Sequence, residues 1–561
     1  MFPAKIVALC VLLAVSPGAR GDSLNELGAA FWQWRAQEQP FSGDDIPRIE
    51  RPSGFVIDWR APTVARRLAE LEEFERRYRA LAPRAATPLP AQVDYRLIGS
   101  ALARVRWELA VQEGWRRNPA FYIDQTLGAV TVLLLPPPPF AIARQQEIVK
   151  RLQQIPGTLQ AARENLTDLR APFVELAIDS LEHVGERLGE MEAALAPLFA
   201  VANRQALDQA LPAAVSALDA YRSWLAARRG SARADTAIGR EAYVFFLRNV
   251  ALLPFTPEEL LAMGRQEWSR AVSFEAYQHT RNAGLPPAPI FADAAAQIAA
   301  EKRDEQEVRV FLVEHHILSV PDDLRHYRNL LLPQYLVPLA ELTEMDDLTG
   351  PSRLDEDGTS YIRPPPTALG FFDLSKAHDP RPIIVHEGVP GHYFQLCLGW
   401  RNPDPIRRHY YDSAANEGIG FYAEEMMLQA GYFDDNPHTL ETIYSFMRLR
   451  ALRVEVDVKL ALGEFSLAQA ADYLAGTVPM DPQTARAEAA FFATGPGQAI
   501  SYQIGKLQIM KLLADSRRAQ GANFSLQKFH DFVWRNGNVP MALQRWELLE
   551  DPSEVPAAAP R

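Results

Sequence analysis

The sequence predicts a mainly α-helical protein, a large multi-helix body with few short strands. Apolar residues recur at three- and four-residue spacing through long segments that are otherwise rich in Arg and Glu. Helix start signals are frequent, whereas apolar β-branched runs are rare. The 561 residues are 48% hydrophobic and 23% charged, which is the balance of an ordinary globular protein.

The first residues have the pattern of an export signal. Lys5 precedes an apolar run over residues 6–15, and Ala19 and Gly21 flank a candidate cleavage position. The run is too short to cross a bilayer. We therefore expect residues 1–21 to be removed, leaving a periplasmic or secreted protein without stable membrane insertion.

Charge and cysteine content narrow the possible partners. A net charge of −12 argues against binding to nucleic acid or to anionic membranes, since both need clustered cations. Cys10 lies inside the apolar run and follows Leu9, where a lipid-attachment signal would have a small residue, so we do not predict a lipoprotein. Cleavage would leave Cys397 as the one cysteine, and no intramolecular disulfide would be possible.

Four segments in the first half of the chain have helical periodicity. The clearest apolar stripe consists of Leu68, Leu71, Phe74, Tyr78 and Leu81, whose spacing places them on one face of a helix. The predicted helices span residues 68–81, 142–152, 174–199 and 207–227.

Two later helices begin with recognisable caps. Thr256 is followed by a proline and, at the third position, by Glu259. Ser466 is followed at the third position by Gln469. In both patterns the two side chains satisfy backbone N–H groups that a helix leaves without partners. The second of these helices is expected to end at Gly476.

Strand signals are confined to one short run. Residues 129–135 are apolar and β-branched and predict a strand, which the prolines at 136–139 terminate. No internal repeat or flexible linker divides the chain. We predict an N-terminal helical lobe over residues 22–240 and a C-terminal helical lobe over residues 241–561, or else one continuous domain.

One short stretch contains the donors of a metal site. His386 and Glu387 follow an apolar run, and His392 lies six residues after His386. Imidazole and carboxylate are the usual ligands of zinc in hydrolases. Residues i and i+6 point about 120° apart in a straight helix and would not converge. Pro390 and Gly391 therefore predict a distorted turn that brings His392 back toward His386.

An acidic helix downstream offers a third ligand. Glu417 and Glu424 are seven residues apart and share a helix face, whereas Glu425 points elsewhere. Glu417 would complete a His-His-Glu set, Glu387 would act as the base, and Glu424 would orient a ligand histidine or replace Glu417 as the ligand. The alternatives are a pair of surface residues and a solvated acidic helix face.

Three motifs resemble the DUF885 family of bacterial proteins. They are His386–Gln395, Glu417–Glu424 and Pro496–Gly505, with weaker matches at 151–156 and 238–243. The resemblance implies a two-lobed helical shell around a deep channel, a downstream glutamate that completes the metal site, and a peptidase-like activity. Where many relatives have a histidine four residues after Asp457, this chain has Ala461, a difference that bears on substrate binding.

The third motif contains candidate substrate contacts. Tyr502 is our first choice as the donor to an oxyanion, although a buried tyrosine with a satisfied hydroxyl is the alternative. Gln498, one helical turn earlier, is a candidate to bind the substrate backbone. Lys506, one turn later, is a candidate to bind a substrate carboxylate, but we favour a solvated lysine.

Two further positions are weaker candidates. Arg450 and Arg453 share a helix face and could clamp a C-terminal carboxylate, but we favour ion pairs with Glu455 or Asp457. Tyr411 would line the channel or simply pack.

These residues together predict a zinc-dependent hydrolase. One zinc ion would be held by His386, His392 and Glu417, with Glu387 as the base and Tyr502 as the oxyanion donor. The expected substrate is a short peptide or a small amide. The alternatives are an inactive helical binding or scaffold protein and a hydrolase of a non-peptide amide.

Overall fold

The computed structural model describes residues 23–42, 49–340, 342, 345–363, 369–478 and 480–557. The export signal predicted over residues 1–21 lies outside these ranges, so its removal stays a prediction. Among the described helices, none combines the length and the apolar character needed to cross a bilayer.

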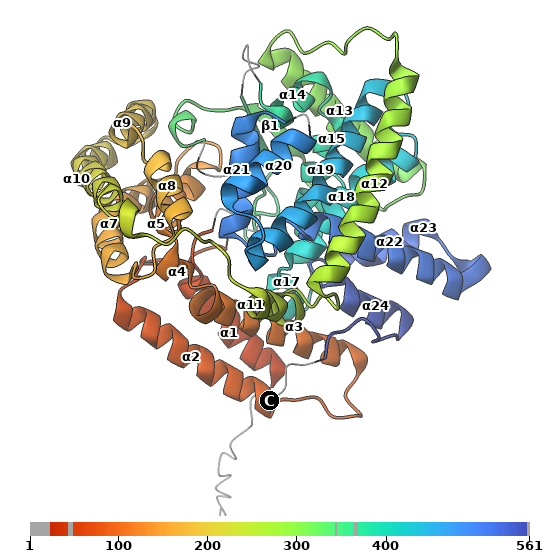
Figure 1. The fold of residues 1–561 in the computed structure, drawn as a ribbon, viewed down its shortest axis with the longest axis horizontal. Helices are drawn as coiled ribbons and strands as arrows, with labels where there is room; N and C mark the ends of the chain where they lie inside the picture. Colours follow the sequence, from red (N-terminus) through yellow and green to blue (C-terminus); the bar gives the residue numbers. More distant parts are fainter. Residues whose placement is uncertain are drawn as a thin grey trace, which may run out of the picture.

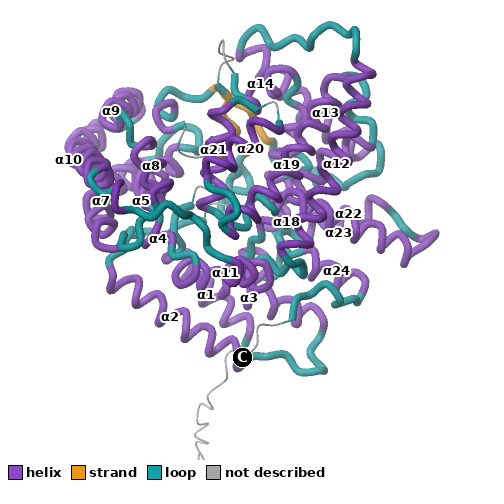
Figure 2. The backbone as a smooth tube through the Cα atoms, viewed as in Figure 1, coloured by secondary structure: helices purple, strands orange, loops and turns teal. Residues whose placement is uncertain are grey.

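The structure is mainly α-helical, as predicted, with 68% helix, 3% strand and one small sheet (Figure 2). The helices up to residue 250 are α1 (Leu24–Glu38), α2 (Ala61–Ala80), α3 (Leu89–Arg106), α4 (Gly114–Arg117), α5 (Pro119–Ile123), α6 (Ala129–Leu134), α7 (Ile142–Asn165), α8 (Ala171–Ser180), α9 (Val184–Leu195), α10 (Val201–Ala226) and α11 (Arg240–Phe245). The next are α12 (Pro257–Asn282), α13 (Ala294–Glu314), α14 (Phe371–His378), α15 (Arg381–Ile383), α16 (His392–Trp400), α17 (Pro405–His409), α18 (Ser413–Gln429) and α19 (Pro437–Leu462). The last are α20 (Leu467–Thr477), α21 (Pro482–Thr494), α22 (Ser501–Gln520), α23 (Leu526–Arg535) and α24 (Met541–Leu549).

Short helical turns of other types complete the chain. The π-helical turns are η1 (Trp107–Val111), η2 (Asp124–Gly128), η5 (Phe246–Val250) and η7 (Ile384–Gly388). The 3-10 turns are η3 (Ala196–Leu198), η4 (Arg229–Ser231), η6 (Val337–Leu339) and η8 (Gly521–Asn523). Single π-helical turns inside α-helices often occur at functional sites, and η7 contains the predicted metal ligand His386.

Most predicted helices are present, with different ends. The stripe at 68–81 lies in α2, where Leu71 and Phe74 are buried. The predicted segment 174–199 is two helices, because His183 adopts a left-handed backbone conformation (φ +53°) between α8 and α9. Both predicted capping boxes are present, at the starts of α12 and α20.

The strand predicted at residues 129–135 is wrong, because this segment forms helix α6. A short, continuously apolar run does not distinguish a buried strand from a buried helix by its periodicity. Val130 and Leu134 are packed in the core of the N-terminal half, so burial rather than β-propensity decides the conformation.

The sheet consists of β1 (Tyr327–Leu331), β2 (Asp346–Asp347) and β3 (Gly358–Ile362) in the order β1-β3-β2. Strand β3 is parallel to β1 and antiparallel to β2. The ring of Tyr327 packs so closely on Gly388 that a Cβ atom there would lie 2.7 Å from it. The sheet therefore supports the segment that carries the predicted metal ligands.

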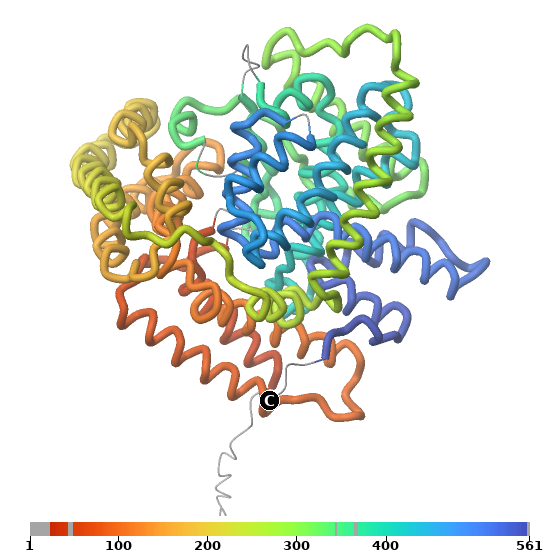
Figure 3. Tube along the Cα trace, in the orientation of Figure 1, coloured from red at the N-terminus to blue at the C-terminus, as the bar shows by residue number. Residues whose placement is uncertain are grey.

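Two helix pairs form the framework around the site. Helices α12 and α19 run side by side, and α18 packs on α22 (Figure 1). Contacts also connect the N-terminal and C-terminal halves of the chain, because α1 touches α17 and α3 touches α24 (Figure 3). The lobe boundary predicted near residue 240 stays a prediction, and these contacts cross it.

Glycines set the distance between α18 and α22. A Cβ atom on Gly418 would lie 2.6 Å from the backbone of Gly505, and one on Gly505 would lie 2.0 Å from the carbonyl oxygen of Ala414. Such contacts are too short for a side chain, so the two backbones can approach this closely only through glycine. This packing fixes the position of Glu417, which precedes Gly418.

We expect Gly505→Ala to lower the free energy of unfolding by about 2 kcal/mol, because the added methyl group must push α22 away from α18. A denaturant titration measures this change. Gly189→Ala is the matched control, since nothing lies within 4 Å of a Cβ atom there. The control should be neutral or stabilise by up to about 1 kcal/mol. Equal midpoints for the two variants would contradict the packing argument.

Candidate metal centre

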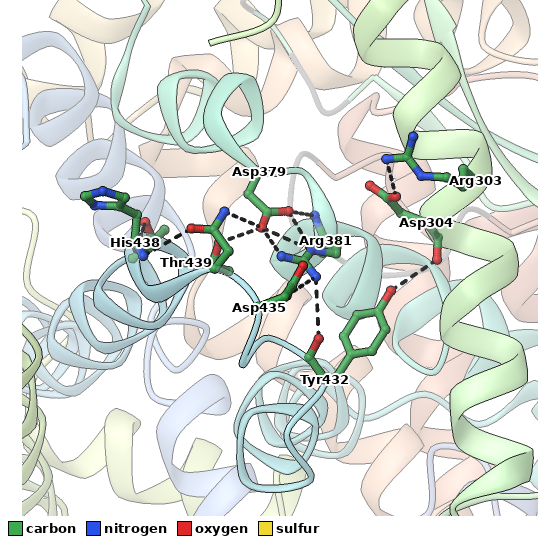
Figure 4. A network of polar contacts seen from close by, with 10 residues as sticks. Arg303, Asp304, Asp379, Arg381, Tyr432, Asp435, His438 and Thr439 are labelled. Carbon is green, nitrogen blue, oxygen red and sulfur yellow. Dashed lines mark hydrogen bonds and ion pairs between the residues drawn. The ribbon is translucent and has the colours of Figure 1, made fainter. Parts of the chain in front are cut away.

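The segment that leads into the metal site is anchored by a buried acid. Asp379 accepts hydrogen bonds from the backbone N–H of Arg381 (3.0 Å), from its guanidinium (2.7 Å) and from the Thr439 hydroxyl. Arg381 also donates to Asp435 at 2.8 Å (Figure 4). Arg381 begins α15, which leads into η7, and Thr439 lies in the first turn of α19. The network therefore connects the segment that carries His386 to α19.

The chain breaks out of its helix between the two histidines. After η7 the backbone of Val389 is extended (φ −124°, ψ 122°), and its N–H bonds to the carbonyl oxygen of Ile384. A Cβ atom on Gly391 would lie 1.7 Å from the carbonyl oxygen of His386, so only glycine fits in this fold-back. A new helix, α16, then begins at His392. The distorted turn predicted from Pro390 and Gly391 is present.

The fold-back brings the two imidazoles together. Their ring centroids are 4.8 Å apart, and the rings are nearly perpendicular. The Nε2 atoms of His386 and His392 each lie 3.4 Å from the same Oε2 atom of Glu417. Ligand atoms about 2.0–2.1 Å from a tetrahedral zinc ion are separated by roughly 3.4 Å. Both imidazole-to-carboxylate distances therefore match the separation expected between two ligands of one zinc ion.

A glycine leaves space for this set. A Cβ atom on Gly420 would lie 3.0 Å from Nε2 of His386 and 3.0 Å from Cε1 of His392. A larger residue at this position would press on the donor edges of both rings. The two glycines after Glu417 therefore permit close approach by different groups, helix α22 at Gly418 and the imidazoles at Gly420.

Glu387 differs from the other acids of the site in its exposure. Its Oε2 atom lies 3.9 Å from Nε2 of His392, and its side chain is 31% exposed. The side chains of His386, His392 and Glu417 are 3%, 7% and 1% exposed. Glu387 also forms a possible three-residue ligand group with the histidines, all within 4.8 Å. We favour Glu417 as the ligand, because it is nearer to both imidazoles and more deeply buried.

The Nδ1 side of His386 is held by two charged side chains. Nδ1 of His386 lies 2.6 Å from Oε1 of Glu424, and Nη2 of Arg450 lies 3.1 Å from that same oxygen. Burial lowers the pKa of His386 to about 3, so the ring is neutral. An acceptor at Nδ1 places the proton there and leaves the Nε2 lone pair directed toward Glu417. Burial also raises the pKa of Glu424 to about 7, and Arg450 opposes this rise.

Tyr502 lies beside the same histidine. Its ring is 6.4 Å from that of His386 between centroids, with a 24° angle between the planes, and the residue is 8% exposed. The guanidinium carbon of Arg453 lies 4.6 Å from the centroid of Tyr502, and that of Arg450 lies 5.8 Å away. Tyr502 is therefore close enough to the imidazoles for the predicted role, which stays a prediction.

The other predicted contacts of the substrate have mixed positions. Gln498 is buried one turn before Tyr502. Tyr411 is half-buried, and its hydroxyl donates to Oδ1 of Asn416 at 3.4 Å, immediately before Glu417. Their roles toward a substrate stay predictions.

The prediction of a solvated Lys506 is wrong. Lys506 is fully buried, and its Nζ atom lies 2.8 Å from Glu425 and 4.3 Å from the ring centroid of Phe421. Burial alone would raise the pKa of Glu425, but Lys506 and Arg270 lower it to about 2. Glu425, which points away from the candidate metal ligands, therefore supplies the charge that allows Lys506 to be buried.

The ion pairs that we favoured for the arginines of α19 also have different partners. Arg450 pairs with Glu424, and Arg453 forms two hydrogen bonds of 2.8 Å with Glu488. Glu488 lies on α21, and helical spacing could not reveal a partner from another helix. Both arginines are buried, at most 5% exposed.

Cys397 and Ala461 are both buried. Burial raises the pKa of the Cys397 thiol to about 11, which keeps it protonated and a poor nucleophile. Ala461 packs with Val458 and Ile504 in an apolar cluster, and its carbonyl oxygen accepts the N–H of Gly239. Its effect on substrate binding stays untested.

Several residues that organise the site were not predicted. Gln395 donates to Gly537 and Asn538 and accepts from Asn416, which connects the helices of His392 and Glu417. Asp379 anchors the segment before His386. Their only local signal is a polar residue in an apolar context, and the bonding partners are distant in sequence.

Comparison with known proteins identifies the family and the fold. A structure from Shewanella oneidensis matches with a TM-score of 0.71 at 16% identity and covers 94% of this chain and 100% of its own. A structure from Colwellia psychrerythraea matches with a TM-score of 0.74 at 16% identity, with 94% and 98% covered. Both are described as a "putative lipoprotein", and at this identity the likeness shows the fold alone.

No curated protein matches the chain. The sequence profile of DUF885, described as a bacterial protein of unknown function, matches residues 51–548. This match includes His386 and His392, the helix that carries Glu417, and Tyr502. The chain belongs to the DUF885 family.

Proposed function

We propose that the protein is a zinc-dependent hydrolase that cleaves amide bonds in short peptides. One observation supports this most strongly. Two imidazole nitrogens lie 3.4 Å from one carboxylate oxygen, and a second, partly exposed carboxylate lies 3.9 Å from one of them. Three protein ligands beside an acid that water can reach is the composition of a catalytic zinc site.

His386, His392 and Glu417 would hold the ion. Zinc, when bound, would lower the pKa of water and polarise the carbonyl group of the substrate. Glu387 accepts the proton of the attacking water and later delivers it to the leaving amine. Tyr502 donates its hydroxyl to the oxyanion that develops on the scissile carbonyl.

The neighbouring charges suit these roles. Glu424 and Arg450 hold His386 with Nε2 directed toward Glu417. Glu387 keeps about a third of its side chain exposed, so it can exchange its proton with a water or a leaving group. Arg450, Arg453 and Lys506 are each buried in a pair with Glu424, Glu488 or Glu425.

We further propose that the protein acts outside the cytoplasm. The apolar leader with Lys5 at its start supports export. The lipoprotein description of the two structures with the same fold agrees with a place in the cell envelope, although Cys10 of this chain lacks the small residue expected before a lipid-attachment site.

We expect Glu387→Gln to retain stoichiometric zinc and to reduce peptide cleavage by about 10³-fold, because the amide cannot accept the proton of the water. The test is digestion of a short-peptide library by zinc-loaded wild type and variant, with and without a chelator. Glu464→Gln, an exposed position, is the matched control and should cleave like the wild type. Equal cleavage by Glu387→Gln, or an unaffected reaction after chelation, rules out the proposed mechanism.

Glu424→Gln should weaken zinc binding by about 10- to 100-fold, because the amide is a poorer acceptor for the Nδ1 proton of His386. Competition against a chromogenic chelator measures the affinity. Because Glu424→Gln also leaves the buried Arg450 without its charged partner, the zinc-free variant should unfold at a lower midpoint, so the affinities are compared under conditions in which both proteins are folded. An unchanged affinity would show that Glu424 does not orient the ligand.

A further inference from the structure

A buried acid on α19 binds a backbone turn, whereas Glu424 of α18 binds the candidate ligand His386. Asp457 is 1% exposed and was expected to pair with an arginine. In the structure its carboxylate accepts the N–H of Gly497 at 3.0 Å, the N–H of Ala499 at 2.8 Å and the hydroxyl of Tyr243 at 2.8 Å. The expected ion pair is therefore wrong, because backbone donors occupy the carboxylate.

The turn is constrained from its other side as well. Gly497 has a left-handed backbone (φ +95°), and a Cβ atom there would lie 2.1 Å from the ring of Phe246. Tyr243 and Phe246 both come from the segment α11–η5, more than 200 residues earlier in the chain. The family motifs at 238–243 and 496–505 thus meet at Asp457.

The turn leads directly into the candidate oxyanion donor. Gln498 lies between the two residues whose N–H groups bond to Asp457, and its carbonyl oxygen accepts both the N–H and the hydroxyl of Ser501. Ser501 begins α22, and Tyr502 is the next residue. A displacement of the turn would therefore move the first turn of α22 and the ring beside His386.

Three residues along one face of α19 each contact a group that borders the candidate site. Arg450 holds Glu424, Arg453 lies over the ring of Tyr502, and Asp457 binds the turn before it. Their three- and four-residue spacing places them along one stripe. The charge on Asp457 matters because hydrogen bonds to an ionised acceptor are roughly twice as strong as neutral ones.

We propose that Asp457 is a positioning residue that fixes the 495–502 turn and thereby places Tyr502 and Gln498 against the metal centre. This inference rests on the proposed function for its effect on the reaction. The N–H of Gly497 also lies 3.0 Å from the second carboxylate oxygen, which accepts the N–H of Ala499. An amide at position 457 could therefore keep both backbone bonds only as weaker, uncharged ones, and its NH₂ group would leave the hydroxyl of Tyr243 without an acceptor. The turn would lose order while the metal ligands stayed in place.

Hydrogen exchange on the full-length, zinc-loaded protein tests the turn directly. We expect Asp457→Asn to speed amide exchange in peptides covering residues 495–502 by about tenfold, while exchange over residues 384–396 and the zinc content stay as in the wild type. Tyr243→Phe, which leaves the carboxylate and its backbone donors intact, should produce a smaller change of the same sign. Asp293→Asn is the matched control, because Asp293 caps α13 through the N–H of Ala296 and Asn caps equally well.

Kinetics on the peptide library test the catalytic consequence. We expect kcat of Asp457→Asn to fall by about 10²-fold with KM within about threefold, as for a displaced catalytic group. Unchanged exchange in the turn, or a loss of activity that follows loss of zinc, overturns the inference. If the wild type cleaves no peptide, the proposed function fails, and the exchange data alone then decide whether Asp457 holds the turn.

Discussion

The break between Gly388 and Gly391 is the constraint on which the site depends. A continuous helix would separate the two imidazoles by about 120° around its axis. The extended backbone at Val389, and the contact that only glycine permits at Gly391, reverse this separation within six residues. The carbonyl oxygen of Pro390 accepts a hydrogen bond from the buried indole of Trp534 at 2.6 Å, so the fold-back is held by a distant helix as well as by its own sequence.

Around this break the protein buries several charges in ion pairs. Glu424 faces Arg450, Arg453 faces Glu488, and Lys506 faces Glu425. A buried ion pair contributes little net stability, but removing one partner is costly because the other charge is left without compensation. Such pairs therefore fix the relative positions of α18, α19, α21 and α22, which are the helices that carry or support the candidate catalytic groups.

The sequence predicted those features of the site that are local. Spacing and the Pro-Gly pair indicated that His386 and His392 would converge, and the capping boxes marked the starts of α12 and α20. The failures share a different cause. Lys506 was expected in solvent, Asp457 was expected beside an arginine, and residues 129–135 were expected as a strand. In each case the outcome depends on groups from distant segments, and no local periodicity records which helix will supply the partner.

The distribution of water access follows from the same architecture and bears on the chemistry. The three candidate ligands are sealed against solvent, which removes competing water from the donors and strengthens the electrostatic interactions among them. Glu387 alone among the acids that face the imidazoles keeps a substantial exposed surface in the described part of the chain. A base must exchange protons, whereas a ligand must not be protonated. The proposed roles place both needs on neighbouring residues, because the buried His386 and the partly exposed Glu387 are adjacent in η7.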